Sequence, residues 1–138
     1  MKNMFSCQSE NYLNMAFDSK RIARLEKPDG YGCRKGDCGD SIEMFLTISN
    51  NTIDHVNFDI DGCLNTRACA NTVACLVEGK TINDAWEISP ESVINFLQTL
   101  PEGETHCAEL AVSTLYQALV NYQQNCQKIW KKQYQKRL

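Results

Sequence analysis

The chain has 138 residues, 43% of them apolar, which fits one compact domain with its own hydrophobic core. Its 14 basic and 17 acidic residues leave a net charge of -3, which is too balanced to imply a nucleic-acid or strongly charged partner, and no nucleic-acid partner is expected. No apolar run is long enough to cross a bilayer, which argues against a membrane protein.

The cysteine content is high, with 8 in the chain. Residues 1–10 lack the continuous apolar core of a secretory signal, so a reduced, cytoplasmic protein is expected. In that compartment, clustered cysteines more often serve metal or sulfur chemistry than disulfides. A secreted, disulfide-bonded protein is the less favoured alternative.

The first part of the chain predicts a short helix and then a loop. Within residues 6–24, Tyr12, Leu13 and Ala16 recur at helical spacing. Residues 27–40 contain several glycines and a proline, a composition typical of a loop.

A β-hairpin is predicted next. Apolar residues alternate along 42–48 and again along 56–60, and the intervening 49–52, Ser-Asn-Asn-Thr, has the composition of a turn. Matching the two apolar faces places Ile42 opposite Ile60.

The same register brings together residues that flank the hairpin. Cys38 and Asp40 stand just before the first strand and Cys63 stands just after the second. Extending the pairing places Cys63 beside Gly39. The sequence therefore predicts a cluster of thiols and a carboxylate at this end of the hairpin.

Two helices are predicted after the hairpin. Residues 66–78 contain no glycine or proline and are followed by Gly79, a typical helix terminator. Ser89 and Pro90 are a favoured N-cap and first helical residue, and that helix ends at 100–103.

A long C-terminal helix is predicted from the absence of glycine and proline after Gly103. Its apolar positions are Ala111, Leu115, Ala118, Leu119, Tyr122, Cys126 and Ile129. Its far end carries Lys128, Lys131, Lys132, Lys136 and Arg137. Basic residues suit the negative end of a helix dipole, so a solvated helix end is favoured over a binding patch.

Two of the thiols fall at predicted helix starts. Cys63 precedes the helix that begins near 66, and Cys107 lies in the first turn of the last helix. A helix N-terminus favours the thiolate, the form that binds metal or attacks sulfur. If the last helix packs so that Cys107 meets the hairpin end, the site has three sulfurs with Asp40 and His106 adjacent, a set that suits a soft metal or an iron–sulfur cluster. The spacing alone leaves buried, inert cysteines as an equal alternative.

The remaining cysteines have less definite interpretations. Cys69 and Cys75 are six residues apart on one helix, hence on different faces, and are interpreted as small buried residues. Cys33 could serve as an accessory sulfur acceptor. Cys7 and Cys126 receive no role.

Five motifs, in order, carry a resemblance to a known family. They are Cys38-Gly39-Asp40, Asp61-Gly62-Cys63, Val77-Glu78-Gly79-Lys80-Thr81, Leu100-Pro101 and His106-Cys107. In this order they resemble the IscU/NifU-type iron–sulfur cluster assembly scaffolds, and the resemblance covers about residues 35–122. It implies an α+β fold, with a small antiparallel sheet packed against helices and a long C-terminal helix.

The resemblance also implies a function without enzymatic turnover. A transient [2Fe–2S] cluster is held by Cys38, Cys63 and Cys107, while Asp40 modulates its lability and His106 is an alternative ligand. A cysteine desulfurase supplies the sulfur, and acceptor apo-proteins receive the cluster. The whole chain, 1–138, is then one scaffold domain, in which an N-terminal arm and helix (1–30) precede the assembly core (31–126) and the basic helix end (127–138).

The chain departs from the family pattern at two places. Leu64-Asn65-Thr66-Arg67 follows Cys63, where the family has Gly-Ser and small residues. The chaperone-recognition form L-P-P-V-K is replaced by Leu100-Pro101-Glu102-Gly103-Glu104, which argues against recognition by the dedicated Hsp70-type chaperone.

Two alternative functions remain open. A zinc protein of the same fold would use the same donors, because three thiolates and a carboxylate satisfy tetrahedral zinc, and zinc can also occupy the isolated scaffold. A thiol sulfur carrier or desulfurase activator would carry persulfide without building a cluster.

Overall fold

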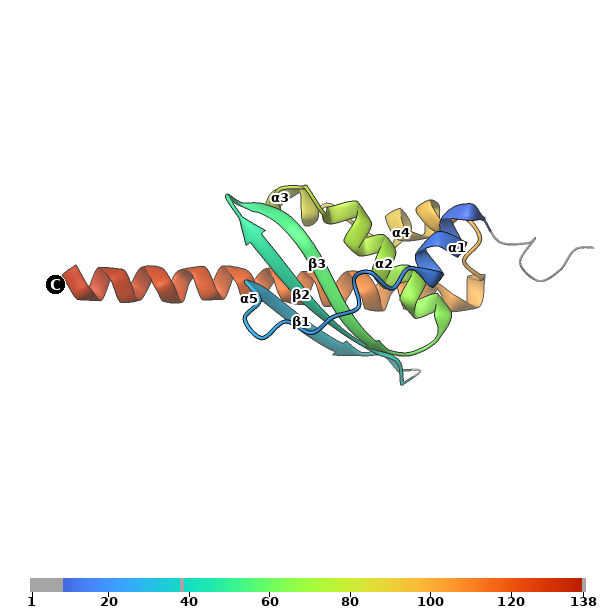
Figure 1. The fold of residues 1–138 in the computed structure, drawn as a ribbon, viewed down its shortest axis with the longest axis horizontal. Coiled ribbons are helices and arrows are strands. Elements are labelled where there is room, and N and C mark those ends of the chain that lie inside the picture. Colours follow the sequence, from blue (N-terminus) through green and yellow to red (C-terminus); the bar gives the residue numbers. More distant parts are fainter. Residues whose placement is uncertain (1–8, 38, 138) are drawn as a thin grey trace, which may run out of the picture.

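The computed structural model describes residues 9–37 and 39–137. The elements, in chain order, are α1 (Glu10–Phe17), β1 (Gly30–Lys35), β2 (Ser41–Ser49), β3 (Thr52–Asp61), α2 (Leu64–Val77), α3 (Ile82–Ala85), α4 (Pro90–Leu97), the 3-10 turn η2 (Glu102–Glu104) and α5 (Thr105–Arg137). The strands form one antiparallel sheet in the order β1-β2-β3. Helix α5 packs on β1 and β2, and α2 packs on β3 (Figure 1). This arrangement confirms the predicted α+β fold.

The β2–β3 hairpin has the predicted register. Ile42 pairs with Ile60, and the inward-facing Met44 pairs with Phe58. Both turn residues have positive φ, 51° at Asn50 and 61° at Asn51. A two-residue turn with that backbone matches the twist of the strands, and Asn is one of the few residues that adopt it readily.

Strand β1 lies where a loop was predicted over residues 27–40, so that prediction was wrong for the part from 30 to 35. The glycines there serve close packing. A Cβ on Gly30 would lie 2.6 Å from the carbonyl oxygen of Ala118, and one on Gly32 would lie 2.4 Å from that of Thr114. Both partners are backbone atoms of α5. The missing side chains therefore let the helix rest directly on the strand.

The predicted helices are confirmed, with small changes at their ends. Helix α1 is capped by Ser9, whose side chain accepts a hydrogen bond from the backbone of Tyr12. Helix α4 begins at Pro90 with a reciprocal capping box between Ser89 and Ser92. Gly79, with φ of 83°, follows α2 as predicted. The short α3 and η2 were not predicted, because a single turn carries too little periodicity to be recognised.

The two cysteines of α2 do not share the predicted environment. Cys69 is buried in the core, whereas Cys75 is exposed, which corrects its interpretation as a buried residue. The two residues lie on different faces of α2, and one face packs on the core while the other meets solvent.

Helix α5 continues beyond the sheet (Figure 1). Ala111, Leu115 and Ala118 are fully buried, but Cys126 is exposed and Ile129 is 58% exposed. The apolar pattern therefore predicts the helix correctly, while its last apolar positions are not in the core. In the part of the chain that the structure describes, no helix combines the length and hydrophobicity needed to cross a membrane.

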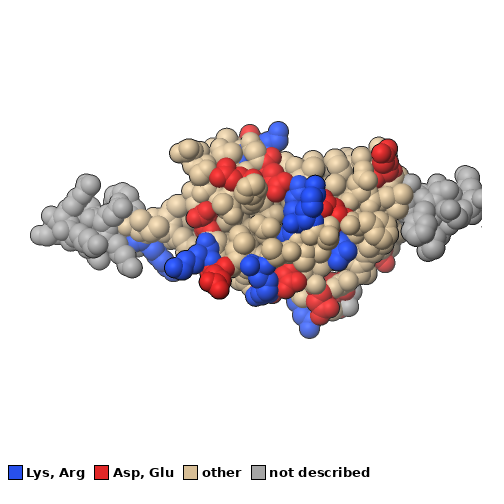
Figure 2. Space-filling view, in the orientation of Figure 1, with Lys and Arg blue, Asp and Glu red and all other residues tan. Residues whose placement is uncertain are grey.

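Charged side chains of both signs are interspersed over the face in Figure 2. Several are joined in ion pairs. A guanidinium nitrogen of Arg21 lies 2.6 Å from Glu78, and one of Arg24 lies 2.6 Å from Glu43. Arg21 and Glu78 tie the segment after α1 to the end of α2.

Candidate cluster and metal site

Three elements meet at one end of the molecule to form the candidate site. The pairing of Ser41 with Asp61 sets the residues just before β2 beside those just after β3. Asp40 precedes β2, Cys63 is the N-cap of α2, and Cys107 lies in the first turn of α5. A carboxylate oxygen and the two sulfur atoms lie within 4.8 Å of one another. The structure thus brings these three predicted residues together.

Gly62 makes room for the Asp40 carboxylate. A Cβ at this position would lie 2.8 Å from Asp40 Cγ and 2.9 Å from its Oδ2. Contacts this short require the carboxylate to move, so the glycine of Asp61-Gly62-Cys63 has a steric role next to the site.

Thr66 lies among the three donors. It is fully buried, and its hydroxyl donates to Asp40 Oδ2 at 2.5 Å. Its oxygen also lies 3.5 Å from Cys63 Sγ and 3.4 Å from Cys107 Sγ. The sequence prediction missed this residue. Its position three residues after the N-cap is a usable signal, because N-cap and N3 side chains face each other at a helix start.

Asp40 is held in its ionised form. The hydrogen bond from Thr66 contributes most to lowering the pKa of Asp40, and the backbone N–H of Cys63, at 3.4 Å from Oδ2, also lowers it. A carboxylate has lone pairs free for a cation only when it is ionised, so Asp40 is available as an oxygen donor at neutral pH.

Cys107 does not have the favoured thiolate predicted from its place at a helix start. It is fully buried, and burial raises its pKa to about 12. Desolvation of the charged form outweighs the dipole of α5 here. The protonated thiol donates to Glu104 Oε2 at 3.6 Å. A metal ion would displace this proton on binding.

A second donor group shares the Cys107 sulfur. One donor atom from each of Glu104, His106 and Cys107 lies within 4.8 Å of the other two. His106 Nε2 is 3.6 Å from Glu104 Oε2. His106 was a predicted site residue, whereas Glu104 was missed as a donor because it was considered only as a departure from the chaperone motif.

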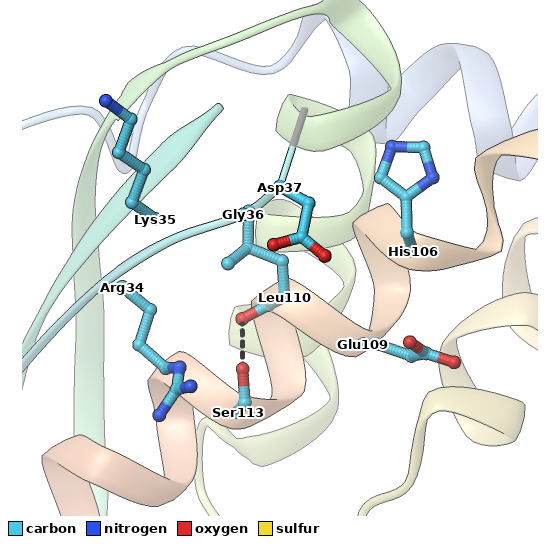
Figure 3. A pocket seen from close by; sticks show the side chains of 8 residues that line it. All are labelled: Arg34, Lys35, Gly36, Asp37, His106, Glu109, Leu110 and Ser113. Carbon is cyan, nitrogen blue, oxygen red and sulfur yellow. Dashed lines mark hydrogen bonds between the residues drawn. The ribbon is translucent and has the colours of Figure 1, made fainter. Parts of the chain in front are cut away.

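Cys38 lies outside the described residues. The backbone on either side of it is described, and the N–H of Gly36 donates to the carbonyl of Asp40 at 2.8 Å. An open groove of about 560 Å³ adjoins this segment (Figure 3). It is lined by Arg34, Lys35, Gly36, Asp37, His106, Glu109, Leu110 and Ser113.

Comparison with known sequences identifies related proteins. The family of NifU-like N-terminal domains matches residues 16–129. The iron–sulfur cluster assembly scaffold protein IscU 1 of Archaeoglobus fulgidus is 30% identical over 116 residues, covering 80% of this chain and 76% of that protein. The scaffold protein IscU of Aquifex aeolicus is 27% identical over 117 residues, covering 83% and 74%.

Solved structures of low sequence identity share the fold. A putative iron–sulfur cluster assembly scaffold protein for the SUF system from Fervidobacterium islandicum has a TM-score of 0.68 at 21% identity, covering 85% of this chain and 99% of that one. The N-terminal part of a NifU-like protein from Brucella abortus has a TM-score of 0.66 at 14% identity, covering 84% and 94%. Together with the family match, these comparisons confirm the resemblance drawn from the motifs, and the chain belongs to the NifU-like N-terminal domain family.

Proposed function

We propose that this protein is a scaffold that assembles a [2Fe–2S] cluster and transfers it to acceptor apo-proteins. The main support is the convergence of Asp40, Cys63 and Cys107, whose donor atoms lie within 4.8 Å of one another. Cys38 supplies the third thiolate and His106 is an alternative to Asp40. The relatives named as iron–sulfur cluster assembly scaffolds support the same role.

The donor set explains why the cluster would be transient. Thiolates bind iron–sulfur clusters strongly, whereas a carboxylate is a harder, less well matched ligand. The cluster is cargo, so one weak ligand provides the position at which an acceptor thiolate can replace a scaffold ligand. Asp40, already ionised and partly accessible, suits that role.

Sulfur arrives as the persulfide of a cysteine desulfurase. The thiolate of one scaffold cysteine attacks the outer sulfur, the S–S bond to the desulfurase breaks, and the desulfurase cysteine leaves as a thiolate. The receiving cysteine must therefore be accessible. Cys63 is exposed and Cys107 is fully buried, which favours Cys63 as the first acceptor.

In this proposal the whole chain acts as one cytoplasmic scaffold domain and performs no catalytic turnover of its own. Residues 31–126 form the assembly core. The replaced L-P-P-V-K segment argues for cluster release without the dedicated Hsp70-type chaperone.

Anaerobic reconstitution tests the proposal. The protein is incubated with a cysteine desulfurase, cysteine and ferrous iron, and the visible spectrum is recorded. We expect [2Fe–2S] absorption from the wild type and its loss in Cys38→Ser, Cys63→Ser and Cys107→Ser. Cys75→Ser is the matched control, since this exposed thiol lies on α2 away from the site. Wild-type protein that acquires persulfide but no cluster would instead be a sulfur carrier.

Zinc binding is the second candidate, because a carboxylate and thiolates also satisfy tetrahedral zinc. Metal analysis of the protein as isolated and after reconstitution distinguishes the two. Zinc that stays bound and prevents cluster formation in the presence of excess iron and sulfide would favour a zinc protein.

A further inference from the structure

We propose that Glu104 is a further metal ligand of this protein: with His106 and Cys107 it forms an outer divalent-cation subsite that shares the Cys107 sulfur with the assembly site and holds ferrous iron before sulfur arrives. This inference rests on the proposed function for its biological meaning, but the cation site stands on its own geometry. Neither the motifs nor the names of the relatives assign a role to Glu104.

The geometry at the junction of η2 and α5 is suited to a cation. Within a regular helix, residues two apart do not face each other. Here Glu104 ends the 3-10 turn and Thr105 begins α5, and the Glu104 carboxylate reaches both following donors. Its Oε2 lies 3.6 Å from His106 Nε2 and 3.6 Å from Cys107 Sγ.

These separations are those of donors around one metal ion. Metal–ligand bonds of about 2.0–2.3 Å at tetrahedral angles set neighbouring donor atoms about 3.3–3.8 Å apart. The two distances from Glu104 Oε2, each 3.6 Å, fall in this range, and the donor atoms of His106 and Cys107 lie within 4.8 Å of each other. An ion held between the three donors requires at most a modest rearrangement of the side chains.

The donor types select the class of ion. Carboxylate oxygen, imidazole nitrogen and thiolate sulfur together suit a borderline divalent metal such as iron, cobalt or zinc, and not magnesium or calcium, which prefer oxygen alone. Affinity alone does not favour iron over cobalt or zinc at such a set, so ferrous ion is assigned as the occupant from the proposed function, in which iron is supplied to the protein.

Exposure indicates the route by which the ion arrives. The side chains of Glu104 and His106 are 35% and 44% exposed, whereas Cys107 is fully buried. An ion from solvent therefore meets the two outer donors before the sulfur. The same sulfur belongs to the group formed with Asp40 and Cys63, so an ion in the outer subsite already binds one ligand of the assembly site.

The charge at position 104 suits a cation. A glutamate carboxylate attracts cations and ligates them through its oxygen lone pairs.

Cobalt(II) titration under anaerobic conditions tests the subsite, because thiolate ligation of cobalt gives a charge-transfer absorption. The host carries Cys38→Ser, Asp40→Ala and Cys63→Ser, so that Cys107 is the one proposed cluster thiolate that remains. We expect this host to bind cobalt and to show a thiolate-to-cobalt absorption band. Adding Glu104→Gln to the host should raise the dissociation constant for cobalt by more than about tenfold. Loss of a residue that only supports a ligand already costs about tenfold or more in metal affinity, and loss of a ligand itself should cost at least as much.

Glu109→Gln is the matched control. Glu109 lies further along the same helix than His106 (Figure 3), and its change to glutamine removes the same negative charge. Cobalt affinity that is unchanged by Glu104→Gln, or equally reduced by Glu109→Gln, overturns the inference, as does a host that binds no cobalt. Far-UV circular dichroism and a thermal melt check that each variant is folded.

Reconstitution of the wild type separates this inference from the proposed function. A cluster that forms while the cobalt result is negative would remove only the subsite. Cobalt binding that depends on Glu104, in a protein that never forms a cluster, would remove the scaffold function and leave a metal-binding site.

Discussion

The Thr66 hydroxyl connects the ligand geometry of the site to its electrostatics. It donates to Asp40 Oδ2 and is the main cause of the lowered pKa of that carboxyl group. Thr66 is therefore the largest contributor to keeping Asp40 ionised, and it also lies next to both sulfur atoms. The isosteric change Thr66→Val removes the hydrogen bond while keeping the volume.

We expect Thr66→Val to raise the pKa of Asp40 and to lower the free energy of unfolding by about 1 kcal/mol at pH 7, after allowance for the partial exposure of Asp40. A carboxylate whose pKa is lowered in the folded state stabilises that state at pH values above its pKa in the unfolded chain, about 3.9. This contribution is lost as the pH falls through the pKa of the folded state. The difference between variant and wild type should therefore vanish at low pH. Carbon-13 NMR titration and urea unfolding of the metal-free protein measure both, and an unchanged pKa would contradict the assignment.

Gly62 provides a second test at the scale of one residue. A Cβ there would displace the Asp40 carboxylate, 2.8 Å away at Cγ, and this side chain can move at small cost. Gly62→Ala should therefore leave the melting temperature within a few degrees of the wild type but weaken cobalt binding to the group of Asp40, Cys63 and Cys107. A variant with unchanged affinity would show that Asp40 does not need its present position.

At this scale, the sequence predicted the donors and missed their support. Cys63, Cys107 and Asp40 stand in recognisable motifs, and the hairpin register already placed Asp40 and Cys63 at the same end of the hairpin. Thr66 owes its importance to distances across three elements, and Glu104 owes its own to the backbone geometry where the 3-10 turn meets α5. The preference of Cys107 for its protonated form depends on burial, which no local pattern reports.

Strand β1 illustrates what the sequence could not show at the scale of an element. A stretch rich in glycine has the composition of a loop, and its strand character comes from pairing with β2 and contact with α5. Hairpin register and helix caps were predictable because they depend on neighbouring residues. The contact of Gly32 with a helix about eighty residues later in the chain was not.

Gly32→Ala tests whether that contact fixes the strand. The new Cβ would lie 2.4 Å from Thr114 O and 2.8 Å from Ala118 N, which are backbone atoms of α5 that cannot move independently. We expect the free energy of unfolding to fall by about 3 kcal/mol, the upper part of the range for overpacking. Gly103→Ala is the control, since nothing lies within 4 Å of a Cβ there. Equal denaturant midpoints for the two variants would mean that β1 and α5 separate easily.

On the scale of the whole molecule, two parts of α5 have different roles. Its first turn carries Cys107 into the site, and its middle, at Leu115 and Leu119, is fully buried against the sheet and the other helices. The C-terminal part of the helix extends beyond the sheet (Figure 1), and Cys126 is already exposed. The sequence pattern continues through both parts, so it could predict the helix but not where its packing ends.

A chain that stops after Cys126 should therefore fold and work almost normally. This truncation removes the described side chains of Gln127 to Ile129, which are all exposed. The one large apolar residue among them, Ile129, is 58% exposed, so little buried apolar surface is lost. The hydrogen bond from Asn125 to the carbonyl of Asp29, at 3.4 Å, is retained. We expect the free energy of unfolding to change by less than about 0.5 kcal/mol, as for surface substitutions, and cluster reconstitution to be unchanged.

A chain that stops after Thr114 is the contrasting variant, because it loses Leu115, Ala118 and Leu119 from the core and should not fold. If truncation after Cys126 lowers the free energy of unfolding by about 2 kcal/mol or more, the projecting end of α5 contributes to the stability of the fold, contrary to this prediction.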